Sequence, residues 1–198
     1  MQEAPRSELR DKVREAYSVA AHNPMDKHPF PVGRAFAESV GYPATLLDSL
    51  PSTAAEAFAG VSNVSLFAEI PEGARVLDLG CGAGLDSLIA ARRVGPSGRV
   101  IGIDFSNTML DKAREAAHEA EIQNLSFKQA DAERLPCGPA SVDVALVNGI
   151  FNLNPARESI FRELARVLRP GGLVYAAELI LRSPLPAHIG QTDADWFA

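Results

Sequence analysis

The sequence predicts an α/β fold of the Rossmann-like, doubly wound class, with a mostly parallel sheet and helices on both of its faces. From Ala74 onward, five apolar segments of strand length alternate with segments of helical periodicity, and short loops join them. The first strand, residues 75–79, passes through a glycine-spaced turn directly into a helix. Strands and helices that alternate in this way form a right-handed parallel sheet covered on both sides.

Residues 1–73 are expected to form an N-terminal helical cap or lid segment, ahead of a core of residues 74–198. Apolar residues recur at helical spacing over residues 7–21, and a proline-rich stretch then interrupts regular structure. Short helices are predicted over residues 34–40, 44–49 and 53–58.

In the core, strands are predicted over residues 75–79, 99–104, 125–129, 142–147 and 173–181. Helices are predicted over residues 86–94, 106–121 and 156–168. The sequence Arg169-Pro170-Gly171-Gly172 is expected to end the last of these helices, because proline cannot continue a helix and glycine favours its C-terminus.

The composition argues against several functional classes. A net charge of −6 disfavours a broad nucleic-acid surface, which requires a basic face. The N-terminus has no apolar leader and no run approaches membrane-spanning length, so no membrane partner is expected. Cys81 and Cys137 lack metal-site spacing, which predicts reduced thiols, a cytoplasmic location and no metal site.

The turn after the first strand has the spacing G-x-G-x-G, formed by Gly80, Gly82 and Gly84, with Asp78 before it. Glycines at alternate positions let a ligand approach the backbone. Dinucleotide folds instead use G-x-G-x-x-G, and a carboxylate would repel their pyrophosphate. S-adenosylmethionine carries a sulfonium and an α-amino group, which a carboxylate attracts. The alternative role for Asp78 is to cap the following helix.

Further candidate residues follow the second and third strands. Asp104 can accept both ribose hydroxyls, or alternatively cap the next helix. Phe105 and Met109 offer apolar surface for an adenine, although each is equally suited to a core position. Asp131 can accept a hydrogen bond from the adenine amino group while the Ala132 N–H donates to the ring.

Asn148 follows the fourth strand, so each group of candidate residues comes at a strand end. Open α/β sheets bind ligands outside the carboxyl ends of their strands, where the strand order reverses. The joint placement of these groups therefore predicts one cofactor site at this edge of the sheet.

Four segments give the chain a clear resemblance to the class I S-adenosylmethionine-dependent methyltransferases: residues 76–84, Asp104, residues 131–136 and residues 168–172. Within the class the chain is most similar to the arsenite methyltransferase branch, on the evidence of residues 13–17, 90–102 and 152–153. The resemblance implies that Asp78 and the three glycines surround the methionine part of the cofactor. It also implies that Tyr17 closes over the cofactor and that the Asn148 backbone faces the amino-acid moiety.

The chain departs from that branch at the positions that bind arsenic. Arsenite methylation requires soft thiolate ligands. An ungapped alignment puts Val61 where the branch has the cysteine of a Gly-Cys-Gly-Asn motif, and Gly149 at the position of a second cysteine. Cys81 and Cys137 do not replace these ligands, so arsenite is not the expected acceptor.

The class normally continues into a final antiparallel strand pair, which is not expected within these 198 residues. The predicted sheet then has an uncovered edge, so the expectation is either that the sequence is a fragment or that a homodimer covers this edge.

The sequence thus predicts a methyltransferase that uses S-adenosylmethionine, with S-adenosylhomocysteine as product, and acts on an unidentified small molecule. The alternative is a catalytically silent, cofactor-binding regulatory or partner subunit; a nicotinamide oxidoreductase is disfavoured by the glycine spacing. Methyl transfer depends chiefly on alignment and needs a base only if the acceptor must lose a proton. His22 and His28 are more typical of surface residues, so no catalytic residue is assigned.

Overall fold

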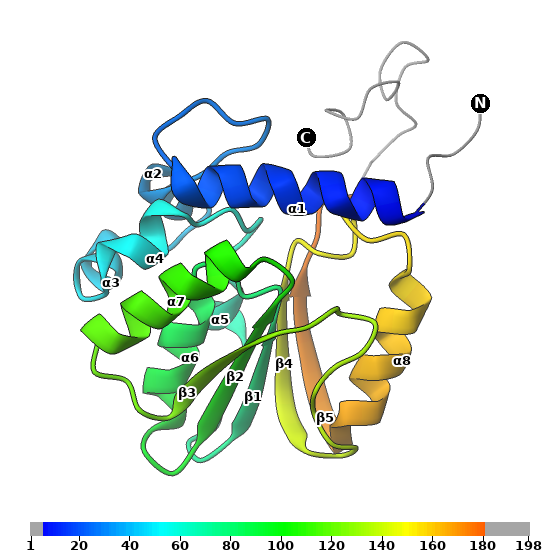
Figure 1. The fold of residues 1–198 in the computed structure, drawn as a ribbon. Coiled ribbons are helices and arrows are strands. Elements are labelled where there is room, and N and C mark those ends of the chain that lie inside the picture. The colour runs from blue at the N-terminus through cyan, green and yellow to red at the C-terminus, as the bar shows by residue number, and fades with distance from the viewer. Residues whose placement is uncertain (1–5, 181–198) are drawn as a thin grey trace.

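A five-stranded parallel sheet forms the centre of the computed structural model, which describes residues 6–180 (Figure 1). The strand order is β3-β2-β1-β4-β5, and every paired neighbour is parallel. The strands are β1 (Arg75–Leu79), β2 (Arg99–Asp104), β3 (Leu125–Gln129), β4 (Val142–Asn148) and β5 (Leu168–Ala177). The order reverses between β1 and β4, which confirms the predicted doubly wound class.

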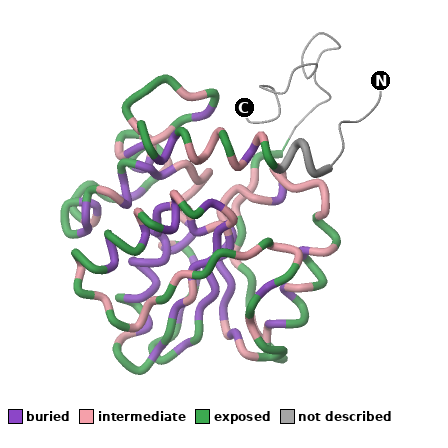
Figure 2. The backbone as a smooth tube through the Cα atoms, viewed as in Figure 1, coloured by how far each residue is buried: buried purple, intermediate pink, exposed green. Residues whose placement is uncertain are grey.

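Helices cover both faces of the sheet, because residues along each strand alternate between two apolar layers. Val76 packs with α5 (Val64–Phe67) and α6 (Leu85–Val94), whereas Leu77 packs with α8 (Arg157–Val167). The helix α7 (Asn107–Glu119) lies beside α6 over β2 and β3. The strands and the inward sides of these helices are buried (Figure 2).

Helices precede β1, as the sequence predicts. They are α1 (Arg6–His22), α2 (Arg34–Ser39), α3 (Ala44–Asp48), α4 (Ser52–Glu56) and α5, of which α5 was not predicted. Figure 1 shows α1 lying across the end of the sheet where the parallel strands terminate. Tyr42 and Leu47 pack in one core with Leu88 of α6. The boundary after residue 73 remains a prediction.

The last strand begins earlier than predicted. Helix α8 ends at Val167, and Leu168 then pairs with Val142, whereas Val144 pairs with Leu173. Residues 169–172 therefore form a bulge within β5, where Gly171 has a φ of 80°. The strand ends at Ala177, and residue 181 of the predicted strand lies outside the described residues.

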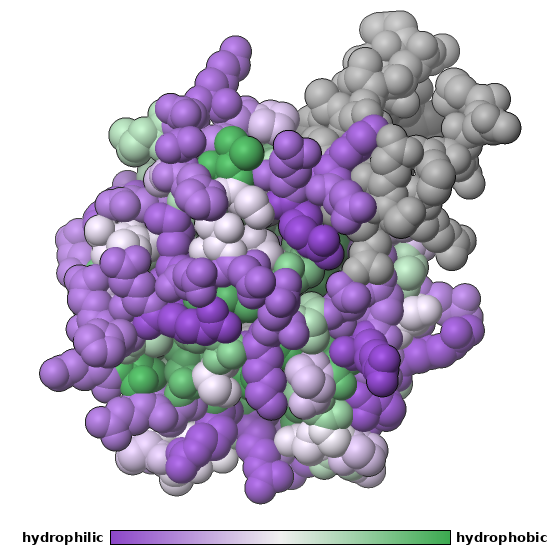
Figure 3. Space-filling view, in the orientation of Figure 1, coloured by the Kyte–Doolittle hydropathy of each residue, from purple (hydrophilic) through white to green (hydrophobic). Residues whose placement is uncertain are grey.

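The molecular face in Figure 3 is largely hydrophilic, with hydrophobic side chains scattered over it. No helix in the described part of the chain has the length and apolar character needed to cross a bilayer.

Candidate cofactor site

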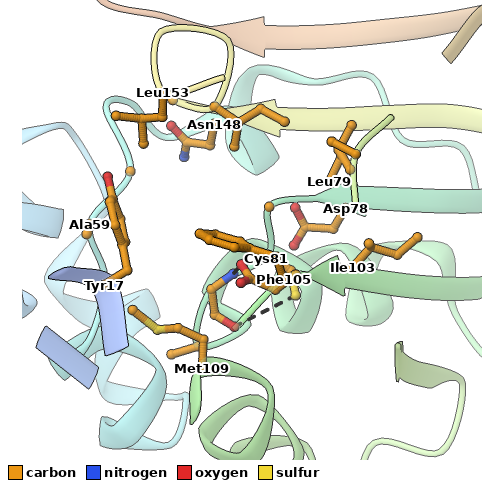
Figure 4. Close-up of a pocket in the computed structure, with 18 of the residues that line it drawn as sticks. Tyr17, Ala59, Asp78, Leu79, Cys81, Ile103, Phe105, Met109, Asn148 and Leu153 are labelled. Atoms are coloured by element: carbon orange, nitrogen blue, oxygen red, sulfur yellow. Dashed lines mark hydrogen bonds between the residues drawn. The ribbon is translucent and has the colours of Figure 1, made fainter. Parts of the chain in front are cut away.

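A pocket lies at the carboxyl ends of β1, β2 and β4, next to α1 (Figure 4). It brings together all of the predicted cofactor residues except Gly84, namely Tyr17, Asp78, Gly80, Gly82, Asp104, Phe105, Met109, Asp131, Ala132 and Asn148. Residues that are more than a hundred positions apart in the sequence thus meet in one cavity, where the strand order reverses.

The glycine turn between β1 and α6 requires left-handed backbone. The φ angles are 75° at Gly80, 51° at Gly82 and 88° at Gly84. The N–H groups of Gly80 and Cys81 donate to the Ile103 carbonyl at 2.8 and 3.0 Å, which fixes the turn against β2. Burial raises the pKa of the Cys81 thiol, so this side chain stays protonated and serves packing.

Gly84 contributes by packing and not by lining the pocket. A Cβ at this position would lie 3.1 Å from Ala113 Cβ and 3.2 Å from Phe127 Cζ, whereas a Cβ on Gly82 would meet nothing within 4 Å. Gly84 therefore lets α6 begin close to α7 and β3, and Gly82 keeps open space for a ligand beside the backbone.

These two glycines give a matched stability test. We expect Gly84→Ala to lower the free energy of unfolding by about 2 to 4 kcal/mol. An alanine there is strained in the left-handed backbone conformation, and its Cβ crowds Ala113 and Phe127. Gly82→Ala should cost only the strain, about 1 kcal/mol. Urea denaturation of the three proteins measures both values, and equal losses would contradict the packing role of Gly84.

Asp78 contacts α6 and also lines the pocket. Its side chain is 2 % exposed, and its Oδ2 accepts a hydrogen bond from the Ser87 hydroxyl of α6 at 2.5 Å. This hydrogen bond agrees with the alternative role of Asp78 at the start of α6, although the donor is a side chain and not a backbone N–H. The Asp78 carboxylate also lines the pocket (Figure 4). Burial, and then repulsion from the Asp86 carboxylate, raise the pKa of Asp78. A cationic ligand group would offset that penalty.

Asp104 is fixed by backbone donors on both sides. Its Oδ2 accepts from the Gly82 N–H at 2.9 Å and its Oδ1 from the Ser106 N–H at 2.8 Å. Ser106, and not Asp104, caps α7, because its hydroxyl accepts from the Met109 N–H. Burial raises the pKa of Asp104. Each oxygen of the carboxylate has a further lone pair with which to accept a ribose hydroxyl.

Tyr17 reaches the pocket from α1. Its ring stacks on Phe30 with centroids 4.4 Å apart, and the neighbouring Ser18 hydroxyl shares a 3.0 Å hydrogen bond with that of Ser106. Burial and the nearby Asp104 and Glu178 carboxylates raise the pKa of the Tyr17 phenol, which therefore stays neutral and able to donate.

The side chain of Asn148 has a role that the sequence did not reveal. Its Oδ1 accepts from the N–H groups of Val61 and Ser62 at 2.8 and 3.1 Å. Its Nδ2 donates to the Ser62 carbonyl at 2.7 Å and to Asp86 Oδ2 at 2.9 Å. Asn148 therefore holds the segment before β1 against the end of β4.

Asp86 was missed altogether by the sequence analysis. It lines the pocket and accepts from the Tyr42 hydroxyl at 2.5 Å and from the Ser65 N–H at 3.2 Å, besides Asn148. Its position in the first turn of α6 looks like ordinary helix-terminal placement. The partners lie 44, 21 and 62 residues away along the chain, so no local pattern could have identified them.

Val61 and Gly149 are neighbours in space. A Cβ built on Gly149 would lie 3.1 Å from Val61 Cγ1. The two positions aligned with arsenic-binding cysteines thus lie together, and neither carries a thiol. Among the described residues, no group of three or more His, Cys, Asp or Glu side chains is placed to hold a metal ion.

Comparison with known proteins identifies the family of the chain. Residues 70–197 match the family described as "Methyltransferase domain". The chain is 39% identical over 160 residues to an arsenite methyltransferase of Halobacterium salinarum, a match that covers 80% of this chain and 40% of the relative. It is also 39% identical over 106 residues to a demethylmenaquinone methyltransferase of Lactococcus lactis, covering 54% of this chain and 42% of the relative.

A similar solved structure is that of an arsenic(III) S-adenosylmethionine methyltransferase from Chlamydomonas reinhardtii. It aligns with a TM-score of 0.61 and 28% identity over 80% of this chain and 53% of that one. The matched part of this chain corresponds to less than half the length of each of the two curated relatives named above.

Proposed function

We propose that this chain, which belongs to the family of methyltransferase domains, transfers a methyl group from S-adenosylmethionine to a small-molecule acceptor. The observation that carries the proposal is the convergence of Asp78, Asp104 and Asn148 on one pocket beside a glycine turn. In this proposal Asp78 receives the cofactor's ammonium group and Asp104 its ribose hydroxyls, while Asp131 and Ala132 contact the adenine.

The residues present fit such a ligand. The open space at Gly82 admits a ligand next to backbone, and the buried carboxylates suit an ammonium and a pair of hydroxyls. The cofactor supplies an electrophilic methyl group for in-line displacement, and the protein's contribution is to hold cofactor and acceptor in line.

Within this proposal, arsenite is not the acceptor. Val61 and Gly149 lie in contact distance where two thiolates would have to be. Cys81 is buried in the glycine turn and its thiol stays protonated, so it supplies no replacement ligand.

A second candidate function is a catalytically silent subunit that binds the cofactor. It is favoured by one observation, which is that the pocket residues in the described part of the chain include neither histidine nor lysine to act as a base.

Two measurements test these functions. Calorimetric titration with S-adenosylhomocysteine should give saturable binding, and no binding below millimolar concentration would refute both. Transfer of a tritiated methyl group from S-adenosylmethionine into any component of a small-metabolite mixture would then exclude the silent subunit. The absence of transfer to every fraction, with the cofactor bound, would favour it.

Binding of S-adenosylhomocysteine should be pH-dependent. Burial raises the pKa of Asp78 in the free protein, and an adjacent ammonium group lowers it again. Binding therefore releases a proton, and affinity should rise with pH up to the raised pKa of the free protein. Calorimetry at about pH 6 and about pH 8, in buffers of different ionisation enthalpy, measures both effects. An affinity that falls with pH would contradict this role of Asp78.

We also propose that a second copy of the chain pairs along β5, the strand at one edge of the sheet. Its Leu173 side chain is 48 % exposed. Open strand edges with apolar side chains favour association. Light scattering should give the mass of a dimer, which a Leu173→Lys substitution should reduce to that of a monomer.

A further inference from the structure

We infer that the methyl acceptor is an uncharged, largely apolar molecule that carries one oxygen or nitrogen acceptor of a hydrogen bond. The inference rests on the proposed function, because it concerns the same pocket, namely the apolar lining residues that are not assigned to the cofactor together with the hydroxyl of Tyr17. It depends on the charge of the pocket, on the apolar side chains at one end of it, and on Tyr17.

The pocket lining is acidic in the described part of the chain. Its acidic members are Asp78, Asp86, Asp104, Asp131 and Glu133, and the described lining residues include no lysine, arginine or histidine. The Arg14 guanidinium lies 5.4 Å from the Phe105 ring, but this side chain is 43 % exposed and pairs with Asp11 outside the lining.

An anionic acceptor would therefore lose its hydration without gaining a cationic partner among the described lining side chains, and only the cofactor's sulfonium would offset that loss. Transfer of an ionised group into a partly buried site is costly unless an opposite charge meets it. The carboxylates that line this pocket would add repulsion. The structure thus disfavours acids and phosphate esters as acceptors.

A cationic acceptor is disfavoured by the reaction. The acceptor's lone pair forms the new bond to the methyl carbon while the pair of the sulfur–carbon bond returns to sulfur, which leaves neutral S-adenosylhomocysteine. An O–H or N–H acceptor then loses its proton to water. A positively charged group would lie beside the sulfonium before transfer and would have no free lone pair to attack with.

One end of the pocket is apolar. Ala59, in the segment that follows α4, and Leu153, in the loop that follows β4, line it there. Val13, Ala54, Ala57, Phe58 and Ile150 add further apolar surface to the pocket lining. Figure 4 shows Leu153 and Ala59 across the cavity from Asp78. Apolar ligand surface buried against these side chains is removed from water, which supplies the main binding energy.

Tyr17 supplies a hydrogen-bond donor at this apolar end. In Figure 4 its ring lies along one side of the cavity and its hydroxyl points toward Ala59 and Leu153. The phenol is neutral, so it donates a hydrogen bond to an acceptor oxygen or nitrogen and orients that molecule. A neutral ring compound with one hydroxyl or carbonyl group has the properties that this end of the pocket selects.

The test compares naphthol with hydroxynaphthoate, which differ by one carboxylate. Each is titrated calorimetrically into the protein saturated with S-adenosylhomocysteine. We expect naphthol to bind at least about tenfold more tightly. Equal or tighter binding of hydroxynaphthoate, or no binding of naphthol, overturns the inference while the proposed function stands. If S-adenosylhomocysteine itself fails to bind, both are overturned.

A charge introduced at the apolar end provides the matched variant. Leu153→Lys should weaken naphthol binding and strengthen hydroxynaphthoate binding, so that the preference is lost or inverted. Met25→Lys, at a residue that is 92 % exposed and does not line the pocket, should leave the preference of the wild-type protein unchanged. Retained S-adenosylhomocysteine binding shows that each variant is folded. An unchanged preference in Leu153→Lys would place the ligands elsewhere and overturn the inference.

Discussion

Asp104→Ala is expected to weaken the binding of S-adenosylhomocysteine by about 100-fold or more. The substitution removes two charge-assisted hydrogen bonds to the ribose, each with a contribution of about 1.5 to 3 kcal/mol. It also releases the Gly82 and Ser106 N–H groups, which the Asp104 carboxylate holds at 2.9 and 2.8 Å. Calorimetric titration of the variant with S-adenosylhomocysteine measures the loss.

Asp111→Ala is the matched control, because Asp111 lies on α7 nearby, is 73 % exposed and pairs only with Arg114 among the described residues. The affinity of the Asp111→Ala variant for S-adenosylhomocysteine should equal that of the wild-type protein. Thermal unfolding without ligand separates a binding defect from a folding defect. If Asp104→Ala binds S-adenosylhomocysteine as tightly as the wild-type protein, the Asp104 carboxylate only stabilises the glycine turn, and the ribose binds elsewhere.

Asn148→Asp is expected to lower the free energy of unfolding by about 3 kcal/mol at neutral pH. The new side chain has nearly the same shape and can still accept from the Val61 and Ser62 N–H groups. It replaces the donor that lies 2.9 Å from Asp86 Oδ2 with a second carboxylate, so two negative charges face each other. Urea denaturation measures the loss.

The pH dependence of that loss identifies its cause. The facing carboxylates raise the pKa of one of them in the folded variant, so the destabilisation should be present above that pKa and disappear as the pH falls through it. Asn107→Asp is the control, because this exposed residue begins α7, where a negative charge is favourable. A destabilisation of Asn148→Asp that is independent of pH would refute the charge argument.

The sequence predicted the fold well because its signals are local. The bounds of β1, β2 and β3 agree with the prediction. The strands β1 and β2 are largely apolar runs, and β3 begins with alternating apolar and polar residues. The start of β5 was wrong because Leu168 continues directly from α8 and pairs with Val142 across a bulge, which no local pattern predicts. The helix α5 spans only Val64–Phe67, too short for a periodic signal.

The sequence predicted those residues of the candidate site that lie at the ends of strands. Asp78 and Asp104 each end or nearly end a parallel strand, so topology alone places them together. The network of Asn148, Asp86 and Tyr42 was not predictable, because it depends on how the segment before β1 returns to the sheet. The apolar end of the pocket was not predictable for the same reason, because it also depends on how the segment before β1 packs against the sheet.

The reversal of strand order between β1 and β4 also bears on how such a protein diversifies. The proposed ligand contacts of Asp78 and Asp104 depend on β1 and β2, whose neighbours on both sides are hydrogen-bonded strands. The residues Ala59, Gly60 and Ile150 lie in connecting segments instead. Substitutions in connecting segments disturb a fold less than those in its strands. Descendants of one gene can therefore change the molecule that they methylate while they keep the same cofactor.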